Sequence, residues 1–169
     1  MIKIPYRYSK SIVLFNWGDI EWGCQNEIIE WKDAVEFALQ QIDDTIDLTV
    51  MELALIDPKH TFDIMALVKT IADKSPFFES SSKRRWLYVA LSWIYEGRAE
   101  FSDPLGIVEE LYADFDYPSD LEPIVRYMPQ KDGYDARNFT FEQNEQRLFE
   151  KWKKIINHWD WDVPGTLRN

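Results

Sequence analysis

The chain has 169 residues, of which 46% are hydrophobic and 15% aromatic, so it can form a sizeable core and is not disordered. Its 30 acidic residues against 19 basic ones give a net charge of −11, which argues against binding to nucleic acids or to anionic membranes. A single cysteine, Cys24, excludes an internal disulfide, and we expect a soluble, cytoplasmic protein in a reducing compartment.

The first 17 residues carry the weakest structural pattern. Their longest apolar run, Ile12–Phe15, has four residues, which is too short for the apolar core of a signal peptide or for a membrane helix. We expect this segment to be a short extended N-terminal arm, with a strand at Ser11–Phe15 as the alternative. Trp17 and Trp22 then flank a segment that we predict to be a turn into the first long helix.

Helical spacing of apolar residues dominates the rest of the chain. It predicts helices within Trp31–Ile42, Ile64–Ala72, Trp86–Tyr95, Ile107–Phe115, Leu121–Met128 and Leu148–Trp159. The third of these is apolar almost all round, which is typical of a buried central helix. We therefore predict an all-α fold, a single domain over residues 1–169 with about six to seven helices in an irregular, solenoid-like array.

Proline, glycine and capping residues indicate where these helices begin and end. Asp103 before Pro104 is typical of a first helical turn, and Gly97 is a natural end for the preceding helix. Pro118 precedes a segment that opens another helix. We predict the longest irregular stretch at Pro129–Arg137.

The acidic residues are concentrated in two blocks that contain no lysine or arginine. Seven acids lie between Asp33 and Pro58, and eight lie between Ala99 and Val125. One interpretation is that both blocks are solvated outer faces of helices. The other is that they form an acidic surface that attracts and orients a cationic partner.

The sequence contains no catalytic motif. The two histidines, His60 and His158, and the single cysteine are isolated, and we interpret them as structural residues. Motifs for phosphate loops, dinucleotide binding, zinc proteases and serine hydrolases are all missing. We therefore predict that the protein is no enzyme and that it binds no cofactor and no metal.

Two sets of carboxylates provide the alternatives to that prediction. Asp114 and Asp116 can divide acid and base roles in a hydrolase if a helix ends between them. Asp43, Asp44 and Asp47 can hold a hard cation, although their spacing lacks the glycine and the distal glutamate of a calcium loop.

The aromatic and acidic run Leu111–Pro118 is compatible with two structures. It suits a protein interface, because rings supply buried area and carboxylates supply direction. It equally suits a corner between helices in which Arg126 pairs with Asp114 or Asp116. The tail Trp159–Asp162 is similarly either docked on the body of the protein or an aromatic anchor for a partner.

Five short motifs lie in order along the chain and cover most of it. They are WGDIEWG (Trp17–Gly23), KRRWLYVALSWIYE (Lys83–Glu96), YADFDYP (Tyr112–Pro118), RYMP (Arg126–Pro129) and DG (Asp132–Gly133). Together they resemble a family of small acidic bacterial proteins of unknown function. The resemblance implies no catalytic residues. It does imply that some relatives are immunity proteins encoded beside contact-dependent or polymorphic toxins.

Our first hypothesis is an immunity protein that binds and neutralises the toxic domain of a cognate bacterial toxin. Its acidic surface would cover a basic active site, and the charge favours a nuclease as the toxin. The alternatives are an adaptor or scaffold that binds another bacterial protein and a carboxylate-dependent hydrolase. The predicted partner-binding residues are Asp43, Asp44, Asp47, Asp103, Glu109, Glu110, Asp114, Asp116, Tyr117 and Asp120.

Overall fold

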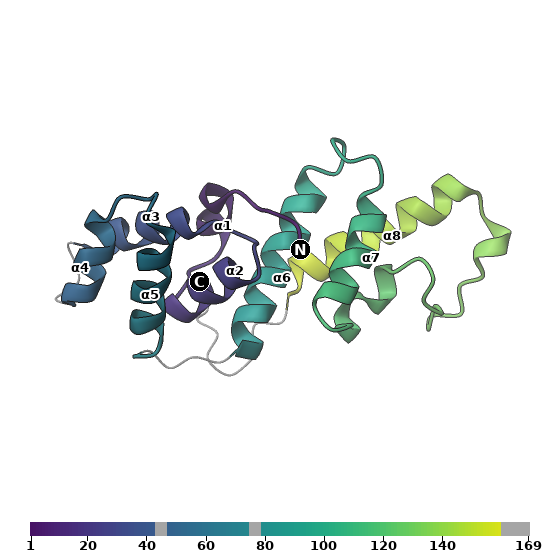
Figure 1. Cartoon of the computed structure of the whole chain (residues 1–169). Helices are drawn as coiled ribbons and strands as arrows, with labels where there is room; N and C mark the ends of the chain where they lie inside the picture. The colour runs from purple at the N-terminus through teal and green to yellow at the C-terminus, as the bar shows by residue number, and fades with distance from the viewer. Residues whose placement is uncertain (43–46, 75–78, 160–169) are drawn as a thin grey trace. The chain divides into compact units, whose positions relative to one another are not determined.

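The computed structural model describes residues 1–42, 47–74 and 79–159 (Figure 1). Every regular element within these ranges is helical, which confirms the predicted all-α class. The chain forms two compact units, of which the first runs from Met1 to Val89 and the second begins at Ala90. Their boundary falls inside the long helix α6 (Glu79–Glu96). The single domain over residues 1–169 stays a prediction.

The first unit contains five described helices and the start of α6. They are α1 (Tyr6–Ile12), α2 (Trp17–Gln25), α3 (Trp31–Gln41), α4 (Leu48–Leu55) and α5 (Thr61–Ala72). α3 and α5 coincide with predicted helices. The other three lie outside them: α1 replaces part of the expected extended arm, α2 replaces the expected turn, and α4 falls where no helix is predicted.

Local interactions explain why the first two helices form. Asn16 Oδ1 accepts a hydrogen bond from the Asp19 N–H over 3.0 Å, and Asp19 Oδ2 accepts one from the Asn16 N–H over 2.8 Å. These reciprocal bonds cap the start of α2. In α1, the buried residues Tyr6 and Ser9 are followed by buried Val13, a spacing that gives the short helix one inward face.

A buried ion pair joins α2 to α6. Arg85 Nη1 donates to the two carboxylate oxygens of Asp19 over 2.7 and 2.8 Å, and the exposed fractions of the two side chains are 1% and 0%. The Ser82 hydroxyl donates to the same carboxylate. Trp86 packs so closely on α2 that a Cβ atom at Gly23 would lie 2.5 Å from its ring. The Asp19 carboxylate is therefore part of the core.

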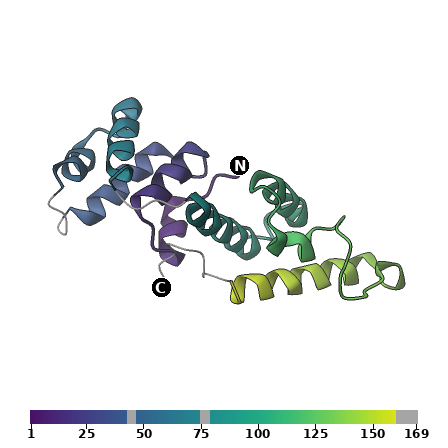
Figure 2. The ribbon, with the colours of Figure 1, turned by 90° about the horizontal axis from the view of Figure 1, so that it is seen from below.

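The second unit combines the end of α6 with four further described elements. They are α7 (Pro104–Asp114), the 3₁₀ turns η1 (Ser119–Ile124) and η2 (Ala136–Asn138), and α8 (Phe141–Asn157). Figure 2 shows the largely irregular chain that leads from η1 to α8, in agreement with the predicted loop. The predicted cap is also confirmed, because the Asp103 carboxylate accepts from the Gly106 N–H over 2.9 Å.

The helix predicted over residues 121–128 is wrong, because the segment forms only the short turn η1. Pro123 lies inside that turn and has no N–H to donate, so an α-helical ladder cannot pass through it. Leu121, Ile124 and Val125 are nevertheless buried. The apolar spacing therefore reports burial correctly but not the type of helix.

Aromatic rings make up much of the core of the second unit. Trp152 of α8 is fully buried, and its ring meets Tyr95 of α6 edge to face, with centroids 5.4 Å apart. Trp159, the first residue of the predicted tail, is buried as well. Residues 160–162 of that tail lie outside the described residues.

Candidate partner-binding surface

Arg126 holds two of the predicted partner-binding carboxylates. Its Nη1 and Nη2 donate to the two oxygens of Asp103 over 3.1 and 3.0 Å, and its Nε and Nη2 donate to Glu109, each over 2.8 Å. The Gly106 N–H and Arg126 together lower the pKa of Asp103, and Arg126 lowers the pKa of Glu109. The single positive charge of Arg126 is therefore shared between two carboxylates, which leaves this group with one net negative charge.

This arrangement corrects the predicted pairing of Arg126 with Asp114 or Asp116. The chain turns back after α7, and the segment after η1 returns to the first two turns of that helix. There the backbone N–H of Arg126 also donates to Glu109, over 3.2 Å. The predicted corner between helical elements exists, but its ion pairs form toward the opposite end of α7.

The C-terminal end of α7 is strained. The helix ends at Asp114, and Asp116 and Tyr117 then adopt left-handed backbone angles, with φ of 60° and 57°. For a bulky residue such as Tyr117 this conformation costs about 1–2 kcal/mol, whereas an aspartate such as Asp116 adopts it more readily. The Tyr117 N–H donates to the Tyr112 carbonyl over 2.7 Å, which closes the turn. The turn holds Tyr117 in place while 63% of its surface stays exposed.

Three tyrosines, Tyr112, Tyr117 and Tyr127, form a cluster beside this turn. Tyr112 is buried, and Tyr117 packs on it edge to face with ring centroids 5.2 Å apart. Tyr127 is 63% exposed. Burial raises the pKa of Tyr112, and the nearby Glu122 carboxylate, Tyr127 and Tyr117 raise it further.

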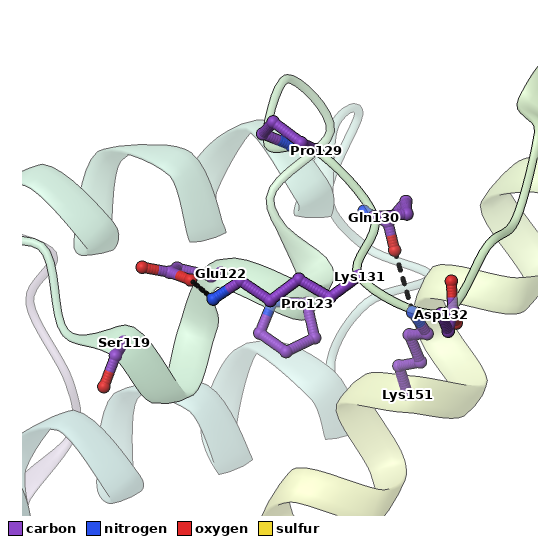
Figure 3. A pocket seen from close by; sticks show the side chains of 8 residues that line it. All are labelled: Ser119, Glu122, Pro123, Pro129, Gln130, Lys131, Asp132 and Lys151. Atoms are coloured by element: carbon purple, nitrogen blue, oxygen red, sulfur yellow. Dashed lines mark hydrogen bonds and ion pairs between the residues drawn. The ribbon is translucent and has the colours of Figure 1, made fainter.

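A pocket of about 310 Å³ lies beside η1 (Figure 3), and its wall includes Glu122, the carboxylate that raises the pKa of Tyr112. It is lined by Ser119, Glu122, Pro123, Pro129, Gln130, Lys131, Asp132 and Lys151. Lys131 Nζ donates to Glu122 over 2.6 Å, and Lys151 Nζ donates to Gln130 over 2.8 Å and pairs with Asp132 at 3.0 Å. Because these charges are paired and prolines form part of the wall, the pocket suits an apolar side chain better than an isolated ion.

The other predicted residues of the second acidic block lie near the surface. Glu110 is exposed and makes no ion pair with any residue in the described part of the chain. The predicted residues Asp114, Asp116, Tyr117 and Asp120 are likewise exposed or partly exposed. We call residues 110–117, together with Tyr127, the α7 corner.

The first acidic block is not part of the α7 corner. Asp47 lies in the first unit, where it pairs with Lys74 at 2.9 Å and caps α4 by accepting from the Thr49 N–H over 2.8 Å. Lys74 and the Thr49 N–H lower the pKa of Asp47 to about 2. Asp43 and Asp44, and with them the alternative cation site, lie outside the described residues.

The carboxylates of the hydrolase alternative are exposed to solvent. α7 ends between Asp114 and Asp116, as that alternative requires, but neither side chain is sheltered, whereas acid–base pairs rely on unequal surroundings. Across residues 1–42, 47–74 and 79–159, no three His, Cys, Asp or Glu residues gather as they would to hold a metal ion. Among the same residues, none of the helices has the length and apolar character needed to span a membrane.

Tyr112, Tyr127 and the lining of the pocket are not among the predicted partner-binding residues. Both tyrosines lie within the motifs YADFDYP and RYMP, so the motifs indicate the correct segments. The motifs do not reveal which ring is buried, because that depends on how the chain returns along α7.

The family relationship of the chain covers most of its length, including the α7 corner. The model of a bacterial family, described as "Uncharacterized protein conserved in bacteria (DUF2247)", matches residues 6–158. No curated protein and no solved structure matches the chain. The chain therefore belongs to the uncharacterized bacterial family DUF2247.

Proposed function

We propose that the protein is an immunity protein that binds the toxic domain of a cognate bacterial toxin through the α7 corner and blocks its active site. The resemblance described above implies this class for some relatives. The partner in this proposal is a protein with a basic surface. A nuclease fits that description, because its active site binds phosphates.

The observation that carries the proposal is the exposed ring of Tyr117, which packs on Tyr112 and lies in a left-handed turn. A left-handed backbone destabilises the protein at this position, and 63% of the residue contacts solvent. Residues with strained backbone angles cluster at binding and catalytic sites. Tyrosines are also enriched among the residues that dominate binding energy, and a ring already in place loses little entropy on binding.

The charge of the α7 corner supports a basic partner. Glu110, Asp114 and Asp116 are exposed within a stretch of chain that carries eight acids and no base. Exposed carboxylates of this kind accelerate the encounter with a cationic surface and orient it. The ion pairs of Arg126 lie toward the N-terminal end of α7. The exposed acids of the α7 corner lie at its C-terminal end.

The pocket beside η1 offers a second type of contact. Its volume of about 310 Å³ lies at the low end of the range of roughly 300–1,000 Å³ for small-molecule sites. It is large enough for one apolar side chain of a partner. An interface centred on the α7 corner would cover it, since a typical interface buries about 800 Å² on each protein.

The test is a capture experiment in the native bacterium, with the tagged full chain as bait at low and at high salt. The wild type is compared with the double variant Glu110→Lys/Asp114→Lys, which reverses two charges on α7. We expect the wild type to retain one toxin-like protein in near-stoichiometric amount at low salt. With the purified partner, we expect association of the variant to be about tenfold slower and less sensitive to salt.

The matched control is Glu96→Lys/Glu100→Lys, which makes the same charge change at two exposed residues of the second unit. Normal binding by this control together with loss by the α7 variant supports the proposal. Equal losses would assign binding to net charge, and unchanged binding in both would exclude the α7 corner as the interface. A captured partner that does not harm cells when expressed alone would favour an adaptor or scaffold instead.

A further inference from the structure

The first unit presents a separate apolar surface on α4 and the start of α5. Leu48 and Leu55 of α4 are 77% and 78% exposed, and Phe62 of α5 is 86% exposed. Leu48, Glu52 and Leu55 are spaced four and three residues apart, so they lie on one face of α4. Two exposed leucines on one helix face, with an exposed phenylalanine seven residues further along the chain, are more than the single exposed residues that are ordinary at a protein surface.

The pattern within α4 indicates that this face is normally covered. The inward face of the helix is already supplied by Val50, Leu53 and Ala54, all of which are buried. The eight residues of α4 include one charged residue, Glu52. A helix that is apolar on two sides is typical of one that packs against neighbours on both. In the part of the chain that the structure describes, Leu48 and Leu55 have no such neighbour on the second side.

Charges around this surface specify the kind of partner. Residues 48–65 contain three acids, Glu52, Asp57 and Asp63, against one base, Lys59, and all four are exposed. Glu52 lies between the two exposed leucines on the same face of α4. A second copy of the chain would bring equal acidic rims together in a symmetric contact, which like-charge repulsion disfavours.

We propose that the surface formed by Leu48, Glu52, Leu55 and Phe62 binds a basic amphipathic helix of a partner protein. The apolar face of such a helix covers the two leucines and the phenylalanine, and its Lys or Arg residues meet Glu52 and the acids at the rim. This surface belongs to the first unit and the α7 corner to the second. The inference therefore stands independently of the proposed immunity function.

The test uses two fluorescently labelled synthetic peptides of about 18 residues, long enough to form helices. One is a leucine and lysine amphipathic helix, and the other has glutamate in place of each lysine. We expect the full chain to bind the basic peptide and not the acidic one in fluorescence anisotropy titrations. Leu55→Ser and Phe62→Ser should each weaken binding about tenfold, and Glu52→Lys should weaken it further.

The matched control is Leu14→Ser, which removes a leucine that is 59% exposed elsewhere in the first unit. This control and Glu110→Lys in the α7 corner should both bind the basic peptide as the wild type does. Thermal unfolding of each variant should remain unchanged, because the replaced side chains are exposed. Equal binding of both peptides, or an equal effect of Leu14→Ser and Leu55→Ser, would overturn the inference. A dimer that dissociates in Leu55→Ser would also overturn it and assign the surface to a second copy.

Discussion

Two arginine–carboxylate systems in this molecule use the same chemistry in opposite surroundings. Asp19 and Arg85 lie in the core of the first unit, with exposed fractions of 0% and 1%. Arg126 holds Asp103 and Glu109 near the surface of the second unit, where 36% of the arginine side chain is exposed. Removing a partner in the core leaves a buried charge without compensation, whereas water can replace a partner at the surface.

The difference shows why net charge is a poor guide to the surface of this protein. The value of −11 counts the buried carboxylate of Asp19 equally with the exposed one of Glu110. It also counts Asp103 and Glu109, which share the single positive charge of Arg126. The negative charge that the second unit presents to a partner therefore depends on which of its acids are paired within the protein.

The largest effect is expected from Arg85→Met. The substitution leaves the buried Asp19 carboxylate without its counter-ion, so the free energy of unfolding should fall by about 3–5 kcal/mol. Urea denaturation followed by circular dichroism measures this loss. A fall below about 1 kcal/mol would mean that the buried and exposed systems are energetically alike.

The next effect in size concerns the packing around the buried pair. Gly23→Ala should lower the free energy of unfolding by about 1–3 kcal/mol, because the new Cβ atom would lie 2.5 Å from the fully buried ring of Trp86. The same denaturation experiment applies. Gly97→Ala is the control, since its nearest contacts lie at 3.4 Å and should accept a methyl group at little cost.

A smaller change in stability is expected from Arg126→Met. The ion pairs of Arg126 are partly exposed, so their loss should lower the free energy of unfolding by about 1 kcal/mol or less. The variant also releases the carboxylates of Asp103 and Glu109. Association with a basic partner should therefore become faster at low salt, as measured by stopped flow. A slower association would contradict the interpretation that Arg126 masks negative charge on α7.

The smallest effect is a change in the acid sensitivity of the second unit. Lys151, with the Tyr134 N–H and Arg147, lowers the pKa of Asp132 to about 2. Because this value lies below that of an unfolded aspartate, about 3.9, the stabilisation is present above pH 4 and is lost as the pH falls toward 2. Asp132→Asn should lower the melting temperature at pH 6 and converge with the wild type near pH 2. If the melting temperatures of the wild type and the variant differed by the same amount at every pH between 6 and 2, the ion pairs of Asp132 would not be the cause of the acid sensitivity.

The parts of the fold that the sequence predicts are those with long apolar stripes. α3, α5, α7 and α8 follow from helical spacing, and the Asp103 cap follows from the aspartate before Pro104. α1 and α2 are too short to give a clear period, and η1 differs from the predicted helix because of Pro123.

The sequence predicts less of the candidate site than of the fold. It indicates the acidic and aromatic segment around Tyr117, but it assigns Arg126 to the wrong carboxylates. Which acids an arginine meets depends on where the returning chain places it along α7. The left-handed backbone at Asp116 and Tyr117 is also invisible in the sequence, because neither residue is a glycine.

The Tyr117→Asn variant separates the role of Tyr117 in binding from its role in stability. Asparagine tolerates the left-handed conformation, so relief of strain should offset the lost contact with Tyr112, each worth about 1 kcal/mol. We expect the affinity for the captured toxin domain to fall about tenfold or more in calorimetric titration, while the melting temperature changes by less than about 3 °C. Unchanged affinity would contradict the claim that the α7 corner binds the partner.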